Sequence, residues 1–153
     1  MYRRKKIEVR PSSYVTIKNG TTIGHGLFAI KWISEGSIIT MFIGEKIDME
    51  TWEKRRHEGL GGYGVQINSN EILDCRQSFG KGECVASAAN SYKNIYNKVT
   101  LKMGKSNAKL VIRNRIALLI STCDIMEETE ILFDYGTAYT HFISIEEQPN
   151  LCS

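Results

Sequence analysis

A pattern of two short apolar runs joined by a turn occurs twice in the chain, and it limits the fold more than any other feature of the sequence. The first copy spans residues 27–39 and the second spans residues 119–131. In each copy the runs are too short for helices and a turn containing Glu separates them, as in a β-hairpin or a β-corner. Glu128 stands at the turn position of Gly36, and a side chain disfavours the left-handed conformation that glycine adopts freely. We therefore expect two β-units whose turns differ in type.

The rest of the chain contains further short runs that alternate with turn residues. The predicted strands are residues 14–18, 63–67, 71–75, 99–103 and 108–112. A turn at Asn19-Gly20 follows the first of them, and residues 68–70 and 104–107 are the predicted loops of two hairpins. The fold is therefore expected to be mainly β.

One segment has the charge order of a helix. Asp48 is suited to cap its N-terminus, Glu50 lies in the first turn, and residues 55–57 place positive charge at the other end. Gly59 is a typical residue just beyond a helix end. Residues 82–90 are rich in small side chains and predict a short second helix. The predicted fold is thus a β-rich domain with small helical inserts.

Size and composition indicate one folded domain. The chain has 153 residues, of which 42% are hydrophobic and 24% are charged, as in an ordinary globular protein. No apolar run approaches the ~20 residues that cross a bilayer, and no secretion signal is recognisable. We expect a flexible basic segment at residues 1–8, the domain at residues 9–145 and a tail at residues 146–153. We also expect an intracellular protein, nuclear if it is eukaryotic, with no membrane contact.

Charge and cysteine content argue against two further kinds of site. The net charge is +3, and the only basic cluster, residues 3–6, is either a nucleic-acid contact or nuclear address, or a solvated terminus. Four charges make a short tract, which favours the solvated terminus, so direct nucleic-acid binding is not expected. The four cysteines are scattered singly, with no CxxC pair and only three histidines. We therefore expect no metal site and interpret the cysteines as small buried or surface thiols.

Four short segments carry residues that could bind a ligand. They are Gly24–Ala29, Phe42–Glu45, Ala88–Tyr92 and Phe133–Gly136. Glycine-rich backbone lets a ligand approach closely, and a partly buried Asn90 needs hydrogen-bond partners. The two aromatic residues around Asp134 form either edge packing or a channel wall. Taken singly, each segment is at least as well explained by a turn or a packed strand end.

Together, in this order and at these separations, the four segments resemble the successive motifs of the SET-domain family of protein lysine methyltransferases. The family has a GxG-[LVF]-[FY]-A start, a [YF]xGE strand end, an NH-type segment and a terminal [FY]DYG. The two turn units also resemble its xxDIxxGExI turns, at residues 32–39 and 124–131. The resemblance covers residues 9–142, nearly the whole chain.

The resemblance implies a fold and a cofactor. The fold is a set of small curved antiparallel sheets, with the segment near Asn90 and the strand leading to Tyr135 threaded together in a C-terminal pseudoknot. The cofactor is S-adenosylmethionine. The cofactor-binding residues that the resemblance implies are Gly24, His25, Gly26, Leu27, Asn90, Ser91 and Tyr135.

The implied reaction is methyl transfer to a lysine of a protein or peptide, most often a histone tail in this family. Lysine, with a pKa of about 10.4, has little free amine at neutral pH, and a dry aromatic channel beside a sulfonium disfavours its ammonium form. Tyr135 matches the catalytic position. Phe133 matches the position where Phe or Tyr tunes the number of methyl groups, and Phe favours di- or trimethylation. Tyr63 and Tyr139 are further channel candidates, each equally well explained as a packed aromatic residue.

The middle segment departs from the family pattern. The family has RFINHSCxPN, whereas residues 87–97 read SAANSYKNIYN, so Ser91 replaces the histidine and no proline precedes Asn97. The post-SET cysteine cluster is absent, since Cys152 stands alone, and residues 49–59 replace a region that contacts substrate in the family. The alternative to an active enzyme is therefore a SET-like module that has lost catalysis and binds a protein partner or nucleic acid.

Overall fold

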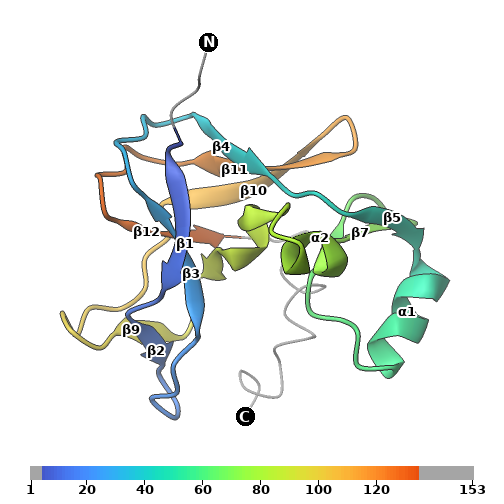
Figure 1. Ribbon diagram of the computed structural model, residues 1–153, viewed down its shortest axis with the longest axis horizontal. Coiled ribbons are helices and arrows are strands. Elements are labelled where there is room, and N and C mark those ends of the chain that lie inside the picture. The colour runs from blue at the N-terminus through green and yellow to red at the C-terminus, as the bar shows by residue number, and fades with distance from the viewer. Residues whose placement is uncertain (1–4, 135–153) are drawn as a thin grey trace.

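Short strands are the main secondary structure of the protein (Figure 1). The computed structural model describes residues 5–134. Its strands are β1 (Ile7–Pro11), β2 (Tyr14–Thr16), β3 (His25–Ala29), β4 (Ile38–Met41), β5 (Glu45–Asp48), β6 (Gly64–Gln66), β7 (Glu71–Asp74), β8 (Asn90–Ser91), β9 (Ile95–Asn97), β10 (Ala108–Arg113), β11 (Ile116–Ser121) and β12 (Glu130–Asp134). Its helices are α1 (Met49–His57), α2 (Arg76–Gly80) and the 3₁₀ helix η1 (Val85–Ala88). The mainly β class with short helical inserts is confirmed.

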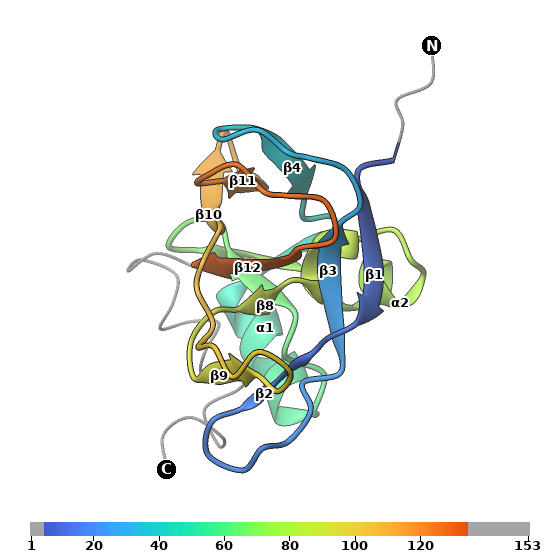
Figure 2. The ribbon, with the colours of Figure 1, turned by 90° about the vertical axis from the view of Figure 1, so that its left-hand side faces the viewer.

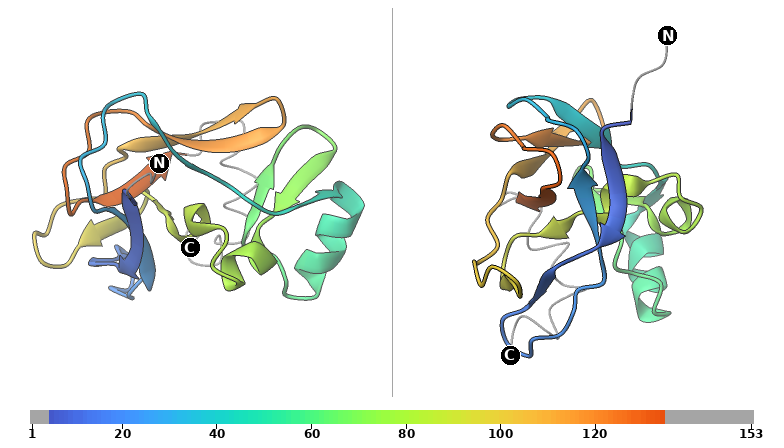
Figure 3. Two further views of the ribbon diagram at one scale, coloured as in Figure 1. Left: turned by 45° about the horizontal axis from the view of Figure 1, so that its top comes forward. Right: turned by 60° about the vertical axis from the view of Figure 1, so that its left-hand side comes forward.

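Within residues 5–134 the strands form three sheets. The largest has the order β1-β3-β12-β10-β11-β4, with β8 paired to β12. The second consists of β2 and β9, and the third has the order β5-β7-β6. Figure 3 shows the third sheet and α1 on the side of the molecule away from β1 and β3. Most neighbouring strands are antiparallel, but β12 runs parallel to both β8 and β10, which the expectation of antiparallel sheets did not include.

The two turn units of the sequence are β-corners, and each unit pairs with the other. β3 of the first unit pairs with β12 of the second, and β11 of the second pairs with β4 of the first. Where the units cross, Ile33 and Ile125 exchange both backbone hydrogen bonds, at 2.9 and 2.8 Å. Ala29 and its counterpart Ser121 each bond to the turn of the opposite unit. The duplicated sequence therefore forms two interlocked corners.

The turns of both corners are left-handed, so the expectation that they differ in type is wrong. Gly36 has a φ of 79° and Glu128 has a φ of 68°. The Glu128 N–H donates to Ala29 O at 2.7 Å, as the Gly36 N–H donates to Ser121 O at 3.0 Å, and the Glu128 carboxylate accepts a hydrogen bond from Arg10. These long-range contacts set the conformation at Glu128 against its local preference.

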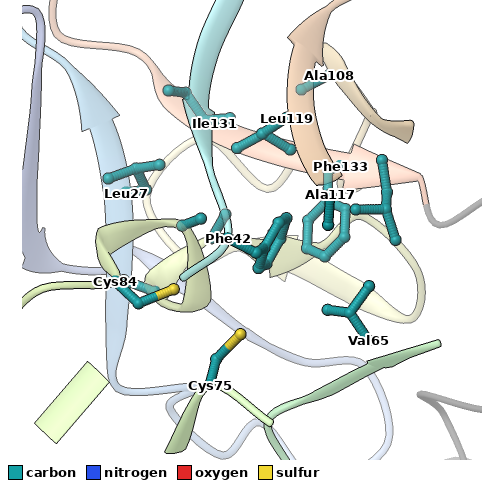
Figure 4. Packing of buried hydrophobic residues seen from close by; sticks show 14 of the residues in the cluster. Leu27, Phe42, Val65, Cys75, Cys84, Ala108, Ala117, Leu119, Ile131 and Phe133 are labelled. Carbon is teal, nitrogen blue, oxygen red and sulfur yellow. The ribbon is translucent and has the colours of Figure 1, made fainter. Parts of the chain in front are cut away.

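The main apolar core lies where the interlocked corners meet the third sheet (Figure 4). Leu27, Leu119 and Ile131, on β3, β11 and β12, are fully buried in it. Phe42 and Phe133 lie beside one another in its middle. Each large side chain buried in this way contributes about 1.5–3 kcal/mol, so the core holds the corners together.

Helix α1 follows the pattern that the sequence predicts. The Asp48 carboxylate accepts a hydrogen bond from the Thr51 N–H at 2.7 Å, and Gly59, with a φ of 77°, lies just beyond the helix end. Trp52 is fully buried against Gly64 of β6, where an added Cβ would overlap the indole ring. One tryptophan thus anchors an otherwise charged helix to the third sheet.

Residues 99–103 form no strand, so the predicted hairpin with residues 108–112 is wrong. Asn97 Oδ1 accepts hydrogen bonds from the N–H groups of residues 99 and 100, at 2.9 and 3.1 Å, and this caps a turn. β10 pairs instead with β11 through a two-residue turn, Asn114-Arg115, in which both residues have positive φ. That geometry matches the twist of a tight hairpin.

The remaining predicted elements are present with adjusted bounds. The hairpin around residues 68–70 is confirmed as β6 and β7. The strand predicted at residues 14–18 ends at Thr16, whose carbonyl accepts the Gly20 N–H at 2.9 Å. Residues 82–90 contain the 3₁₀ helix η1 and the first residue of β8, and α2, which precedes them, was not predicted.

β1 pairs with β3 from Ile7 onward, inside the range expected to be a flexible basic segment. The threading of a pseudoknot involves residues after Asp134, which lie outside the described residues, as do Tyr135 and Tyr139. No helix in the described part is long and apolar enough to cross a membrane. Among residues 5–134 no three His, Cys, Asp or Glu side chains gather as metal ligands would.

Candidate active site

A cavity of about 370 Å³ opens where the large sheet faces the third sheet. It is lined by the glycine-rich segment, by the end of η1 with the start of β8, and by an aromatic wall. The main lining residues are Ile23, Gly24, His25, Phe42, Tyr63, Phe79, Ser87, Ala88, Ala89, Asn90 and Phe133. All four candidate segments of the sequence therefore contribute to one cavity.

Strand β12 is the support that brings these segments together (Figure 2). Its first residues pair with β3, with Ile131 opposite Leu27, and its following residues pair with β8, with Leu132 opposite Asn90. β3 and β8 thus meet end to end along one strand. This is why residues far apart in sequence, near positions 25 and 90, border the same cavity.

The glycine-rich segment offers backbone to a ligand at Gly24. Gly24 has a φ of 82°, and no atom lies within 4 Å of the position that its Cβ would take. Its carbonyl accepts the Ser12 N–H at 2.8 Å, which fixes the segment. Gly26 is different, because a Cβ there would overlap the Glu130 carboxylate. The Leu27 side chain is fully buried and belongs to the core.

Asn90 joins β8 to the glycine-rich segment. Its Nδ2 donates to His25 O at 2.7 Å and lies 3.5 Å from Glu130 Oε2. Its Oδ1 accepts no hydrogen bond from residues 5–134 and remains available to a donor in the cavity. The Ser91 hydroxyl accepts the Lys93 N–H at 3.3 Å and so serves the turn that follows. Of this pair of predicted residues, Asn90 is the one whose side chain can face a ligand.

Aromatic rings form the apolar side of the cavity. The Phe42 and Phe133 ring centroids are 6.2 Å apart with an interplanar angle of 52°, and both side chains are buried. Tyr63 stacks on Phe79, with centroids 5.2 Å apart and planes at 30°. Tyr63 therefore lines the cavity and is also a packed aromatic residue, and its role in a lysine channel stays a prediction. The described residues provide a dry wall that suits an alkyl chain.

The Phe42–Glu45 segment supports the wall through its last two residues. A Cβ at Gly44 would overlap the Asp74 carbonyl, so β5 can approach β7 closely only with glycine there. The Arg55 guanidinium contacts Asp74 at 2.8 Å and Glu45 at 2.9 Å. The hydrogen bonds that Arg55 donates, to Asp74 first and then to Glu45, raise the pKa of Arg55. Glu45 thus ties α1 to the third sheet.

Two buried thiols lie behind the aromatic wall. Cys84 Sγ accepts the Ile43 N–H at 3.2 Å and lies 3.2 Å from Ser87 Oγ. A hydrogen bond from Cys75 is the main cause that lowers the pKa of Cys84, against the effect of burial. Cys75 and Cys84 are free and buried and Cys123 is free and exposed, which confirms the interpretation of these three cysteines as simple thiols.

Two polar residues that sequence reasoning missed hold the start of β12. Asn107 Oδ1 accepts the Leu132 N–H at 2.9 Å, and Asn107 Nδ2 donates to Glu130 O at 3.0 Å. Asn97, the last residue of the atypical middle segment, instead caps the turn after β9. The Glu130 carboxylate is buried, and burial raises its pKa. An asparagine directly before the apolar run of β10 was the available signal.

The family comparison agrees with this geometry. The SET domain model matches residues 24–136, which include the four segments around the cavity and both corner turns. A search of curated proteins found no match. Because the family match covers most of the chain, the protein belongs to the SET-domain family, whose members are in general S-adenosylmethionine-dependent protein lysine methyltransferases.

Proposed function

We propose that the protein is an S-adenosylmethionine-dependent protein lysine N-methyltransferase. The observation that carries the proposal is the single cavity shared by Gly24, Asn90 and Phe133. The first two residues offer backbone and amide groups to a polar ligand, and the third offers an apolar wall to an alkyl chain. A cofactor and a lysine that react must be held together in such a place.

The residues around the cavity fit this cofactor. The cavity of about 370 Å³ lies within the size range of small-molecule sites. The open backbone at Gly24 admits the amino-acid end, and the free Asn90 Oδ1 suits an ammonium donor. When bound, the cofactor supplies a methyl group on a sulfonium, which is already an activated leaving group.

The aromatic wall acts on the lysine. Phe42 and Phe133 exclude water from their side of the cavity, and an ammonium without water or a counter-ion is disfavoured, so the lysine pKa falls and the free amine becomes available. Tyr135, our proposed catalytic residue, directly follows the last residue of β12. Its hydroxyl would orient the amine toward the methyl group.

We further propose that the enzyme adds two or three methyl groups and that histone tails are its substrates. Phe133 supports the first point because its ring carries no hydroxyl to hold a water or restrain the amine. Phe133→Tyr adds that hydroxyl at a buried position, and we expect the product to shift toward monomethyl-lysine. Mass spectrometry of a methylated peptide measures this, and an unchanged product distribution would remove Phe133 from this role. Family membership is the support for histone tails as the first substrates to assay.

Calorimetric titration with S-adenosylmethionine tests the cofactor proposal. We expect binding in the micromolar range, lost in Asn90→Ala, whose amide reaches the cavity from β8. Binding without methyl transfer to any lysine substrate would favour the alternative, a module that has lost catalysis. The replacement of the family's histidine by Ser91 is the feature that favours this alternative.

A further inference from the structure

The Glu130 carboxylate has no role in the reaction proposed above, yet it lies among the polar contacts of the site. Its side chain is buried, with 8% of the residue exposed. Within residues 5–134 it forms no ion pair with a lysine or arginine. Ser12 Oγ lies 2.8 and 2.9 Å from its two oxygens. Burying a carboxylate is unfavourable unless hydrogen bonds compensate, so its position calls for an explanation.

Glu130 contacts both segments that would bind the cofactor. Its Oε2 occupies the space that a side chain at position 26 would take, which keeps the backbone of Gly26 against it. The same oxygen lies 3.5 Å from Asn90 Nδ2, which also donates to His25 O at 2.7 Å. Two segments that are distant in sequence are thus joined through one carboxylate and one amide.

The Asn90 amide has only one favourable orientation between these two acceptors. With Nδ2 toward His25 O and Glu130 Oε2, both of its N–H bonds have partners and Oδ1 is left for the cavity. The opposite orientation would place Oδ1 against two oxygen atoms, which repel it. A neutral side chain at position 130 that can donate a hydrogen bond would weaken this selection, because only His25 O would still favour Nδ2 on this side.

We propose that Glu130 is a positioning residue: its buried carboxylate holds the Asn90 amide with Oδ1 directed to the cavity, where it accepts a hydrogen bond from the ammonium of the cofactor's amino-acid end. The identity of the ligand rests on the proposed function. The orientation of Asn90 does not, because it follows from contacts within the protein alone.

The test uses Glu130→Gln and two ligands in calorimetry. S-adenosylmethionine has the ammonium, and methylthioadenosine lacks the whole amino-acid end. We expect Glu130→Gln to weaken the binding of S-adenosylmethionine about tenfold or more, as for loss of a hydrogen bond to a charged group. The affinity for methylthioadenosine should stay nearly unchanged. Equal weakening of both ligands would mean general damage to the site and would overturn the proposal. Glu128→Gln, two residues away on an exposed carboxylate, is the matched control and should change neither affinity.

The pH dependence gives a second readout. Protonation of Glu130 removes its charge, so S-adenosylmethionine binding to the unmodified protein should weaken as pH falls through the carboxyl pKa, which burial raises above 4.5. Glu130→Gln should lack this step. Burial first, and then the charge of Glu130, raise the pKa of Tyr14. Arg10 on β1 is engaged by Glu8 and Glu128, and His25 is the same residue in both proteins. Parallel pH profiles would contradict the proposal.

A third readout is independent of the cofactor. NMR signals of the Asn90 side-chain NH₂ in the ligand-free protein should shift in Glu130→Gln and stay in place in Glu128→Gln. Unchanged Asn90 signals in Glu130→Gln would overturn the proposal whatever the ligand is. Absence of S-adenosylmethionine binding in the unmodified protein would instead refute the proposed function. If Glu130→Gln does not fold, Ser12→Ala keeps the carboxylate, removes its main donor and should shift the same signals.

Discussion

Glycine at position 128 should give a more stable protein than alanine, although the natural residue is glutamate. The φ of 68° at Glu128 costs a residue with a Cβ about 1–2 kcal/mol, and glycine avoids this cost while losing about 0.5–1 kcal/mol through its flexibility in the unfolded chain. We therefore expect Glu128→Gly to be more stable than Glu128→Ala by about 1 kcal/mol. Both variants lack the ion pair with Arg10, so its contribution cancels.

The same left-handed conformation predicts the effect on stability of a substitution at Gly36, the equivalent position in the first corner. Gly36 has a φ of 79° and no atom within 4 Å of the place where a Cβ would lie. Gly36→Ala should therefore lower the free energy of unfolding by about 1 kcal/mol through backbone strain alone. Urea unfolding measures these differences. Glu127, the neighbour without a positive φ, is the control, and there alanine should be the more stable residue. Glu128→Ala equal to or more stable than Glu128→Gly would refute the equivalence of the two corners.

Three further changes test the supports of the site. Gly64→Ala should destabilise the protein by about 1–3 kcal/mol in urea unfolding, because the new Cβ overlaps Trp52, and an unchanged midpoint would contradict the packing of α1. Asn107→Ala leaves two backbone groups of β12 unpaired, at Glu130 and Leu132, and each should lower the free energy of unfolding by about 1–3 kcal/mol. A smaller loss would contradict the role of Asn107 as a support of β12. The raised pKa of Glu130 means that the folded protein binds this proton more tightly, so its contribution to stability falls as pH rises above 4.5. Relative to Glu130→Gln, the unmodified protein should therefore lose stability from pH 4.5 upward, and a constant difference would contradict the burial of an ionised carboxyl.

The sequence predicted those elements whose signals are local. Asp48 and Gly59 mark the ends of α1 because caps act within one turn of a helix. The hairpin at residues 68–70 has turn residues between two apolar runs, and it formed. The four candidate segments were found by their order along the chain, and the cavity they share follows from the family fold.

The errors occurred where distant contacts override local preference. Glu128 is left-handed because the opposite corner fixes its N–H, a partner that no local pattern reveals. The run at residues 99–103 appeared to be a strand, but Val99 and Leu101 are each 75% exposed, so its apolar residues are not evidence of burial.

The polar supports were missed for the same reason. Asn107 and Glu130 act through β12, and their partners were invisible until the strand order was known. Pairing of β12 with β3 and β8 joins segments separated by most of the chain, and periodicity within one segment carries no information about that choice.

Transfer of a labelled methyl group tests the central claim most directly. The protein is incubated with S-adenosylmethionine carrying a radioactive methyl group and with histones or cell extract, and labelled sites are identified by mass spectrometry. We predict label on lysine side chains, lost in Tyr135→Phe and in Asn90→Ala while both variants remain folded. Label on another residue type, no label on any protein, or full activity in Tyr135→Phe would contradict a lysine methyltransferase built around these residues.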